Sequence, residues 1–157
     1  MYDHILFPTD GSDGSAAAVA HVREMAEAFD ATVHVLHVVD TRQFQLGMGG
    51  SYISGPKGYL SDQSSEDDRK RQVEERARPF VEELAADFEG IDTVSAVREG
   101  SPHREILEYL DENDIDLVVM GTGGHNGVER YLLGSVSERV VRLADAPVVT
   151  VRADDSE

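Results

Sequence analysis

The sequence lacks cysteine altogether, has no tryptophan and contains no long apolar stretch. Without cysteine the chain can form neither disulfides nor thiolate metal sites. No segment approaches the 18 consecutive apolar residues that a membrane-spanning helix needs, so we expect no membrane association. The N-terminal residues MYDHILFPTDG have no basic region before an apolar core, so they do not resemble a signal peptide. We therefore expect a cytoplasmic protein.

Basic residues are scarce: the 14 lysines and arginines face 31 acidic residues, which gives a net charge of −17. Proteins that bind a nucleic-acid backbone or an anionic membrane need a basic footprint, so we expect neither as a partner. Lys57 and Lys70 are the only lysines. An acidic, lysine-poor surface resembles the proteins of salt-loving organisms such as halophilic archaea, where salt screens the repulsion. An ordinary acidic protein is the alternative interpretation.

The 157 residues, 40% of them hydrophobic, are enough for one domain that buries roughly two-thirds of its unfolded surface. We expect that domain to span residues 1–152, with a polar tail at 153–157. Residues 41–62 have no periodic pattern and are rich in glycine. Loops of this length are either functional lids or partly disordered segments, and the sequence leaves both open.

Short apolar, valine-rich runs alternate with amphipathic ones along the rest of the chain. The apolar runs predict five strands, at residues 4–7, 31–39, 93–98, 116–120 and 147–151. The amphipathic runs predict helices at residues 15–29, 64–88, 102–113 and 136–143. This alternation indicates an α/β fold with a parallel sheet and right-handed crossovers. We expect an open, doubly wound, Rossmann-like sheet in the order 3-2-1-4-5, because the loops after the first and fourth strands carry the chemically suggestive residues.

Two prolines allow predictions about the helices in which they lie. Pro79 should kink or divide the helix at 64–88, whose charged residues should form a solvated outer face. Ser101 and Pro102 predict a helix start, with the serine as N-cap and the proline in the first turn.

Asp10 follows the first predicted strand, and the glycine-rich run that begins at Gly121 follows the fourth. In a sheet of this order, both lie at the carboxyl edge, where the strand order reverses and ligands bind. A phosphate-binding P-loop is excluded, because no lysine stands near the glycines. The dinucleotide-binding fingerprint is only partly matched, because Asn126 stands at a position where that fingerprint requires glycine. A tight turn without any ligand is the remaining alternative.

The pattern Gly121-x-x-Gly124, nine residues, then Gly134-Ser135 resembles the nucleotide-binding signature of the universal stress protein family, in its ATP-binding branch. Pro8-Thr9-Asp10 and His37-Val38-Val39-Asp40 are similar to further landmarks of that family, as are the segments Gly100-Ser101-Pro102 and 146–151. The resemblance covers the chain except the loop at 41–62. It implies an adenine nucleotide α-hydrolase-like fold that holds ATP, with or without Mg²⁺.

The resemblance also implies a role for each motif. The adenine would lie at the backbone of Val38, and the carboxylate of Asp10 would face the ribose hydroxyls. Glycines would let the backbone approach the ribose and α-phosphate, and the start of the last helix would bind the outer phosphates. The residues assigned to nucleotide binding are Pro8, Thr9, Asp10, Val38, Met120, Gly121, Gly123, Gly124, Arg130, Gly134, Ser135, Val136 and Ser137.

Two of these positions carry open alternatives. Gly123 stands where family members often have histidine or another side chain, and His125 could substitute for it from a different position. Arg130 could steer ATP or pair with a surface carboxylate.

Nothing in the sequence identifies catalytic machinery. The histidines are scattered, and His34 and His37 are three residues apart on a strand, so they face opposite sides and cannot chelate one metal. We therefore expect a stress-response or regulatory protein that binds ATP and hydrolyses it slowly at most. A nucleotide-free structural dimer and a slow ATPase are the alternatives. The resemblance implies a homodimer through the last strand, Val148–Val151, whose exposed edge needs covering.

Overall fold

The computed structural model of the chain describes residues 2–9, 13–39, 66–122 and 135–152. The strands are β1 His4–Pro8, β2 Thr32–Val39, β3 Thr93–Glu99, β4 Leu117–Gly121 and β5 Val148–Val151. The helices are α1 Asp13–Phe29, α5 Glu66–Ala85, the short 3₁₀ helix η1 Ala86–Phe88, α6 Pro102–Glu112 and α7 Ser135–Leu143. These bounds lie within two residues of the predicted ones, except that the long charged segment ends as two helices. The predicted loop at 41–62 and the tail at 153–157 lie outside the described residues.

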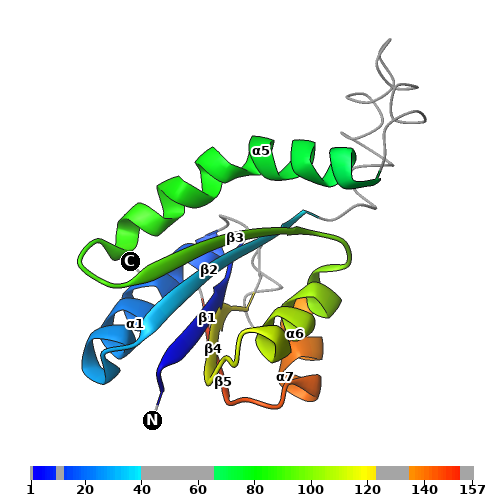
Figure 1. Ribbon diagram of the computed structural model, residues 1–157. Coiled ribbons are helices and arrows are strands. Elements are labelled where there is room, and N and C mark those ends of the chain that lie inside the picture. Colours follow the sequence, from blue (N-terminus) through cyan, green and yellow to red (C-terminus); the bar gives the residue numbers. More distant parts are fainter. Residues whose placement is uncertain (1, 10–12, 40–65, 123–134, 153–157) are drawn as a thin grey trace.

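The five strands form one parallel sheet in the order β3-β2-β1-β4-β5 (Figure 1). This confirms the predicted order and direction of the strands. The central position of β1 and β4 follows from their composition, because residues buried on both faces of a sheet must be apolar throughout. All of the residues from Ile5 to Pro8 and from Leu117 to Gly121 are buried.

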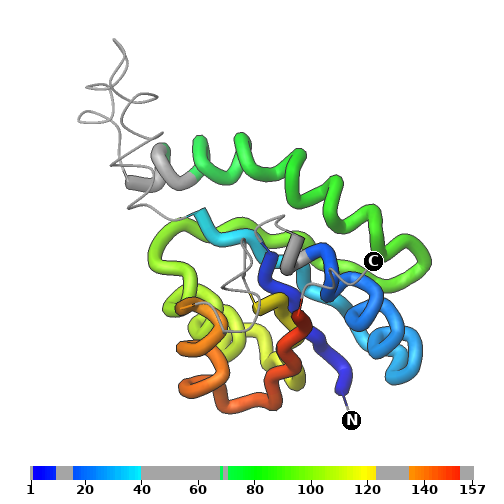
Figure 2. The backbone as a smooth tube through the Cα atoms, turned by 180° about the vertical axis from the view of Figure 1, so that it is seen from behind, coloured from blue at the N-terminus to red at the C-terminus, as the bar shows by residue number. Residues whose placement is uncertain are grey.

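Helices cover both faces of the sheet, and views from opposite sides show the same two layers (Figures 1 and 2). One core lies beneath α1 and α5, and the other lies beneath α6 and α7. Consecutive residues of a strand alternate between them: Phe7 packs edge-on against Phe88 in the first core, whereas Leu6 belongs to the second. The sheet is therefore buried on both faces.

The prolines behave differently from one another. Pro79 does not divide α5, which is one continuous helix from Glu66 to Ala85 (Figure 1). The side chain of Pro79 is exposed. Pro102 begins α6 as predicted, and Ser101 occupies the N-cap position with extended backbone. The predicted capping role of the Ser101 side chain is wrong, because its hydroxyl lies 3.3 Å from Nδ1 of His103 and makes no capping hydrogen bond.

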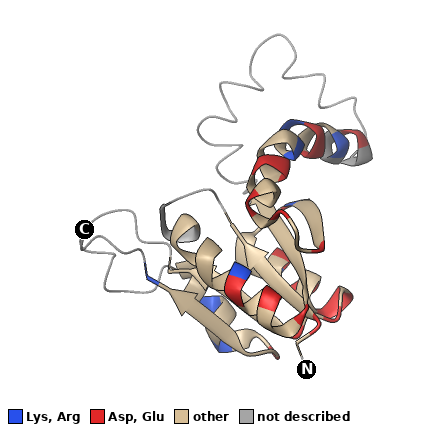
Figure 3. Cartoon of the chain, turned by 90° about the vertical axis from the view of Figure 1, so that its left-hand side faces the viewer, with Lys and Arg blue, Asp and Glu red and all other residues tan. Residues whose placement is uncertain are grey.

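The charged run of α5 forms a solvated outer face, as predicted (Figure 3). Glu74, Glu75 and Arg76 are exposed on it, whereas Val73 and Val81 are buried beneath it. Within the part of the chain that the structure describes, no helix is long and apolar enough to cross a membrane.

Candidate functional site

The pairing of β1 with β4 ends before the carboxyl edge of the sheet. These two strands pair only at Ile5 with Leu117 and at Leu6 with Val118. Beyond that point β1 stays paired with β2 as far as Pro8, and β4 stays paired with β5 as far as Gly121. The ladder between β1 and β4 therefore ends early, at the place where the strand order reverses. Ligands of such sheets bind at this point.

Pro8 explains why the pairing ends where it does. The amide of Thr9 donates to the carbonyl of Leu36 on β2, so the backbone nitrogen of the preceding residue points toward β4. That residue is Pro8, which carries no N–H and removes one hydrogen bond from the ladder. A proline inside a central strand is unusual for this reason. Here it ends the pairing of β1 with β4, the two strands between which a ligand crevice is expected in such a sheet.

The two strand ends are hydrogen-bonded away from each other. The Thr9 amide donates to Leu36 of β2 at 2.9 Å, and the Thr122 amide donates to Val151 of β5 at 3.0 Å. Both threonines are buried, each with 6% of its surface exposed. The amides of these two threonines are therefore used by the outer ladders, and neither of them joins β1 to β4.

Side chains supply donors where the strand ladders end. Nδ1 of His37, on β2, lies 3.0 Å from the carbonyl oxygen of Thr9. The hydroxyl of Ser137, in the first turn of α7, donates to the carbonyl oxygen of Gly121 at 2.9 Å. Each of these bonds satisfies a backbone carbonyl at the carboxyl end of a central strand. The bond from Ser137 also brings the start of α7 to the end of β4.

The start of α7 is suited to an anion. The first amides of a helix have no partner within it, and the helix dipole is positive at that end. Ser137 is buried at 3% exposure, Val136 is half-buried and Ser135 is exposed. Because Ser137 is bonded to Gly121, this helix start lies at the end of β4. A phosphate group bound there would lie beside the crevice.

The structure brings together eight of the thirteen residues that the sequence analysis assigned to the site. They lie at the carboxyl ends of β1, β2 and β4 or in the first turn of α7, and they are Pro8, Thr9, Val38, Met120, Gly121, Ser135, Val136 and Ser137. The other five lie outside the described residues: Asp10, Gly123, Gly124, Arg130 and Gly134.

Sequence reasoning missed a polar cluster at the same edge. Nδ1 of His103, at the start of α6, lies 3.3 Å from the Ser101 hydroxyl and 3.5 Å from a guanidinium nitrogen of Arg139 on α7. Arg139 thus places a cation within two turns of the α7 N-terminus. No spacing in the sequence could reveal it, because the packing of α6 against α7 creates the contact.

The histidines of β2 face opposite sides of the sheet, as the sequence predicted. His37 packs against Phe80 of α5, and His34 contacts Tyr109 of α6. Among the described residues, no group of three or more histidine, aspartate and glutamate side chains could hold a metal ion.

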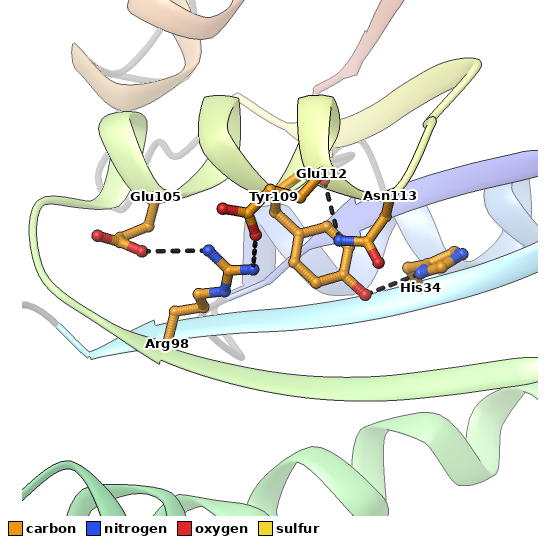
Figure 4. A network of polar contacts seen from close by, with 6 residues as sticks. All are labelled: His34, Arg98, Glu105, Tyr109, Glu112 and Asn113. Atoms are coloured by element: carbon orange, nitrogen blue, oxygen red, sulfur yellow. Dashed lines mark hydrogen bonds and ion pairs between the residues drawn. The ribbon is translucent and has the colours of Figure 1, made fainter. Parts of the chain in front are cut away.

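His34 belongs to a second polar network, beneath α6 (Figure 4). Its Nδ1 lies 2.8 Å from the hydroxyl of Tyr109, and its Nε2 lies 3.1 Å from Nδ1 of His4. Burial, together with the neighbouring His4, lowers the pKa of His34. Burial also raises the pKa of Tyr109, although the charge of Arg98 opposes this shift. The network joins β1, β2 and α6 and supplies no group to the crevice.

Arg98 completes this network above the tyrosine ring. Its guanidinium carbon lies 5.1 Å from the centroid of Tyr109, within reach of a cation–π contact. The guanidinium also forms ion pairs with Glu105 and Glu112 of α6 (Figure 4). These pairs attach α6 to β3.

Comparison with known proteins agrees with this architecture. Residues 1–152 match the universal stress protein family. The chain belongs to this family. It is 36% identical to universal stress protein MJ0531 of Methanocaldococcus jannaschii, over all of this chain and 86% of the relative. Protein MJ0577 of the same organism has a solved structure that superposes with a TM-score of 0.76, at 27% identity, over 99% of both chains.

Two other solved structures of the family contain adenine nucleotides. One is a universal stress protein in complex with cAMP, with a TM-score of 0.67 at 22% identity over 98% of this chain and 99% of that one. The other is a family member from Arabidopsis thaliana with AMP bound, with a TM-score of 0.60 at 18% identity over 97% and 92% of the two chains. At these identities the likeness concerns the fold.

Proposed function

We propose that this universal stress protein binds an adenine nucleotide, ATP with or without Mg²⁺, at the carboxyl edge between β1 and β4. The observation that carries the proposal is the early end of the pairing between these strands, with the start of α7 bonded to the end of β4. The family structures that contain cAMP and AMP support it. The protein then acts in a stress response or in regulation, with hydrolysis of ATP slow at most.

The residues at this edge fit such a ligand. Gly121 is buried and has no Cβ, so the backbone at the end of β4 can come close to a ribose or a phosphate. The amides of Ser135, Val136 and Ser137 would bind the outer phosphates at the helix start. Val38, the second-last residue of β2, lies on the α6 and α7 face, where its backbone would contact the adenine.

Residues outside the described part of the chain complete the proposed site. Asp10 would accept hydrogen bonds from the ribose hydroxyls, and Gly123, Gly124 and Gly134 would admit the phosphates. Arg130 would attract them. The contact of Asp10 with the ribose rests on the family pattern Pro8-Thr9-Asp10.

Calorimetric titration with ATP, ADP, AMP and cAMP, in molar KCl, tests this function. We expect ATP to bind, and the Asp10→Ala variant to bind about thirtyfold more weakly, because two hydrogen bonds of roughly 1 kcal/mol each are lost. Asp92→Ala is the matched control, since Asp92 is an exposed carboxylate before β3, near the opposite edge of the sheet. Measuring phosphate release on the same samples separates binding from hydrolysis. The absence of affinity for every nucleotide would refute the proposal and favour a nucleotide-free structural dimer.

We further propose that the protein is a homodimer paired through β5. This strand ends the sheet, and its residues, Val148–Val151, are apolar or β-branched. The carbonyl oxygens of Pro147 and Val151 accept hydrogen bonds from the amides of Val118 and Thr122. Because successive residues of a strand alternate in direction, the backbone groups of Val148 and Thr150 point outward. Exposed strand edges of this kind pair readily with another strand.

A proline at either edge of the sheet tests the dimer. Thr150→Pro removes an outward N–H and leaves the bonds to β4 in place. Ser95→Pro is the matched control, because it makes the same change on the outward side of β3, at the other edge. We expect light scattering in high salt to give a monomer for Thr150→Pro and a dimer for the wild type and for Ser95→Pro. A monomeric wild type would contradict the assignment.

A further inference from the structure

One histidine, His37, is bonded to the end of β1 beside the crevice. Its Nδ1 lies 3.0 Å from the carbonyl oxygen of Thr9. A carbonyl can only accept, so Nδ1 must carry the hydrogen and donate it. The amide of Thr9 donates to the carbonyl of Leu36. Both backbone polar groups of Thr9 are therefore bonded to consecutive residues of β2.

These bonds fix a peptide plane at the edge of the crevice. The Thr9 carbonyl belongs to the peptide bond that joins Thr9 to the next residue, and that bond is planar. Rotation of this plane would break the hydrogen bond from His37. His37 thus fixes the orientation of the Thr9 carbonyl at the end of β1, beyond the last residue that pairs with β4.

The His37 ring is itself held in place by α5. It packs edge-on against Phe80, with ring centroids 4.9 Å apart and planes at 68°. An aromatic contact of this geometry restricts the orientation of the imidazole and hence the direction of its N–H. The end of β1 is thereby supported by two other elements, β2 and α5.

We propose that His37 is a positioning residue of the nucleotide crevice, acting through the Thr9 carbonyl and not by contact with the ligand. This inference rests on the proposed nucleotide-binding function. A site whose backbone is already fixed loses less conformational entropy when the ligand binds, so it binds more tightly. Loss of the donor should weaken nucleotide binding even in a chain that remains folded.

Two substitutions separate the hydrogen bond from the ring. His37→Phe keeps an aromatic ring against Phe80 but has no donor. His37→Asn loses the ring but places an amide N–H where Nδ1 was. By calorimetric titration we expect His37→Phe to bind ATP about tenfold more weakly, the effect of one lost hydrogen bond. His37→Asn should bind within about twofold of wild type. If His37→Phe does not fold, His37→Ala takes its place in the comparison.

His34→Leu is the matched control. It removes a more deeply buried histidine from the same strand, but on the opposite face and away from the crevice. Thermal unfolding should show that His34→Leu is less stable than His37→Phe, while its affinity for ATP stays within about twofold of wild type.

The outcomes are distinguishable. Failure of the wild type to bind any nucleotide would refute the proposed function itself. If the wild type binds and His37→Phe binds equally well, His37 has no positioning role. Equal weakening in His37→Phe and His37→Asn, or in His34→Leu, would also overturn the inference, because the loss would then not depend on the donor at Nδ1.

Discussion

Removal of one buried hydroxyl, by Tyr109→Phe, tests the energetics of the network beneath α6. The hydroxyl lies 2.8 Å from Nδ1 of His34, and the exposed fractions are only 4% for Tyr109 and 6% for His34. Phenylalanine keeps the ring, and with it the contact with Arg98 and the packing of α6. The substitution therefore removes the hydrogen bond and little else. His34 is left with a buried ring nitrogen that has lost this partner.

The expected cost is about 1–3 kcal/mol in the free energy of unfolding, the range for a buried polar group that loses its partner. For a chain of this size that corresponds to a decrease of roughly 3–10 °C in the unfolding temperature. Replacement of both partners should cost less than the sum of the single changes, because no buried polar atom is then left over. Tyr109→Phe combined with His34→Leu should therefore show a coupling of about 1–2 kcal/mol.

Urea unfolding followed by circular dichroism, at fixed salt, gives all four free energies of this cycle. The single variants should shift the midpoint and leave the slope unchanged. Strict additivity of the two changes would refute the reasoning, since it would mean that the 2.8 Å contact contributes nothing to stability.

The same cycle has a pH dependence whose sign follows from the pKa of His34. Burial and His4 hold this pKa below its ordinary value of about 6.5 in the folded protein. Below pH 6.5 the unfolded chain therefore binds a proton that the folded chain does not. As the pH decreases below 6.5, the free energy of unfolding should decrease by at most about 1.4 kcal/mol per pH unit, until the pKa of His34 in the folded protein is reached. The difference between the wild type and His34→Leu isolates this effect, because both contain the same carboxylates. A difference that does not change between pH 7 and 5 would contradict it.

Three shorter predictions concern the edge of the sheet and its charge. Pro8→Ala supplies a backbone amide on the β4 side, and the free energy of unfolding should change by no more than about 1 kcal/mol. If Pro8 alone ends the ladder, this amide should pair with β4 and exchange its hydrogen slowly with solvent; rapid exchange would show that another feature ends the ladder. Ser137→Ala should lower the free energy of unfolding in urea by about 1 kcal/mol through the lost bond to Gly121, and an unchanged midpoint would count against that bond. Finally, if the net charge of −17 reflects adaptation to salt, added KCl should raise the unfolding temperature, whereas a flat or falling curve would favour an ordinary acidic protein.

The sheet could be predicted from the sequence because its signals are local and its strand order follows from a simple rule. Runs such as residues 31–39 contain enough β-branched and apolar residues to identify buried strands. Their order followed from the loops that carry Asp10 and Gly121. The sequence could not decide between a kink and a break at Pro79, because the effect depends on how the helix accommodates the lost hydrogen bond; the break is wrong, since α5 continues through this residue.

The bonds that shape the crevice could not be predicted. His37 and Thr9 are 28 residues apart, and Ser137 and Gly121 are 16 apart. Neither pair has a spacing that suggests contact, since the bonds exist only because β1, β2, β4 and α7 end together at one edge. The sequence resemblance placed the proposed site at this edge, and the register of the strands adds that the pairing of β1 with β4 ends there.

The most direct test of nucleotide binding begins with the purified protein. Mass spectrometry of the small molecules released on denaturation, followed by ATP titration of the emptied protein in molar KCl, measures occupancy and affinity together. The proposed site between β1 and β4 predicts bound adenine nucleotide, or saturable ATP binding with one site per chain. A protein that is empty and has no measurable affinity for ATP would contradict the account and leave the glycines as a turn.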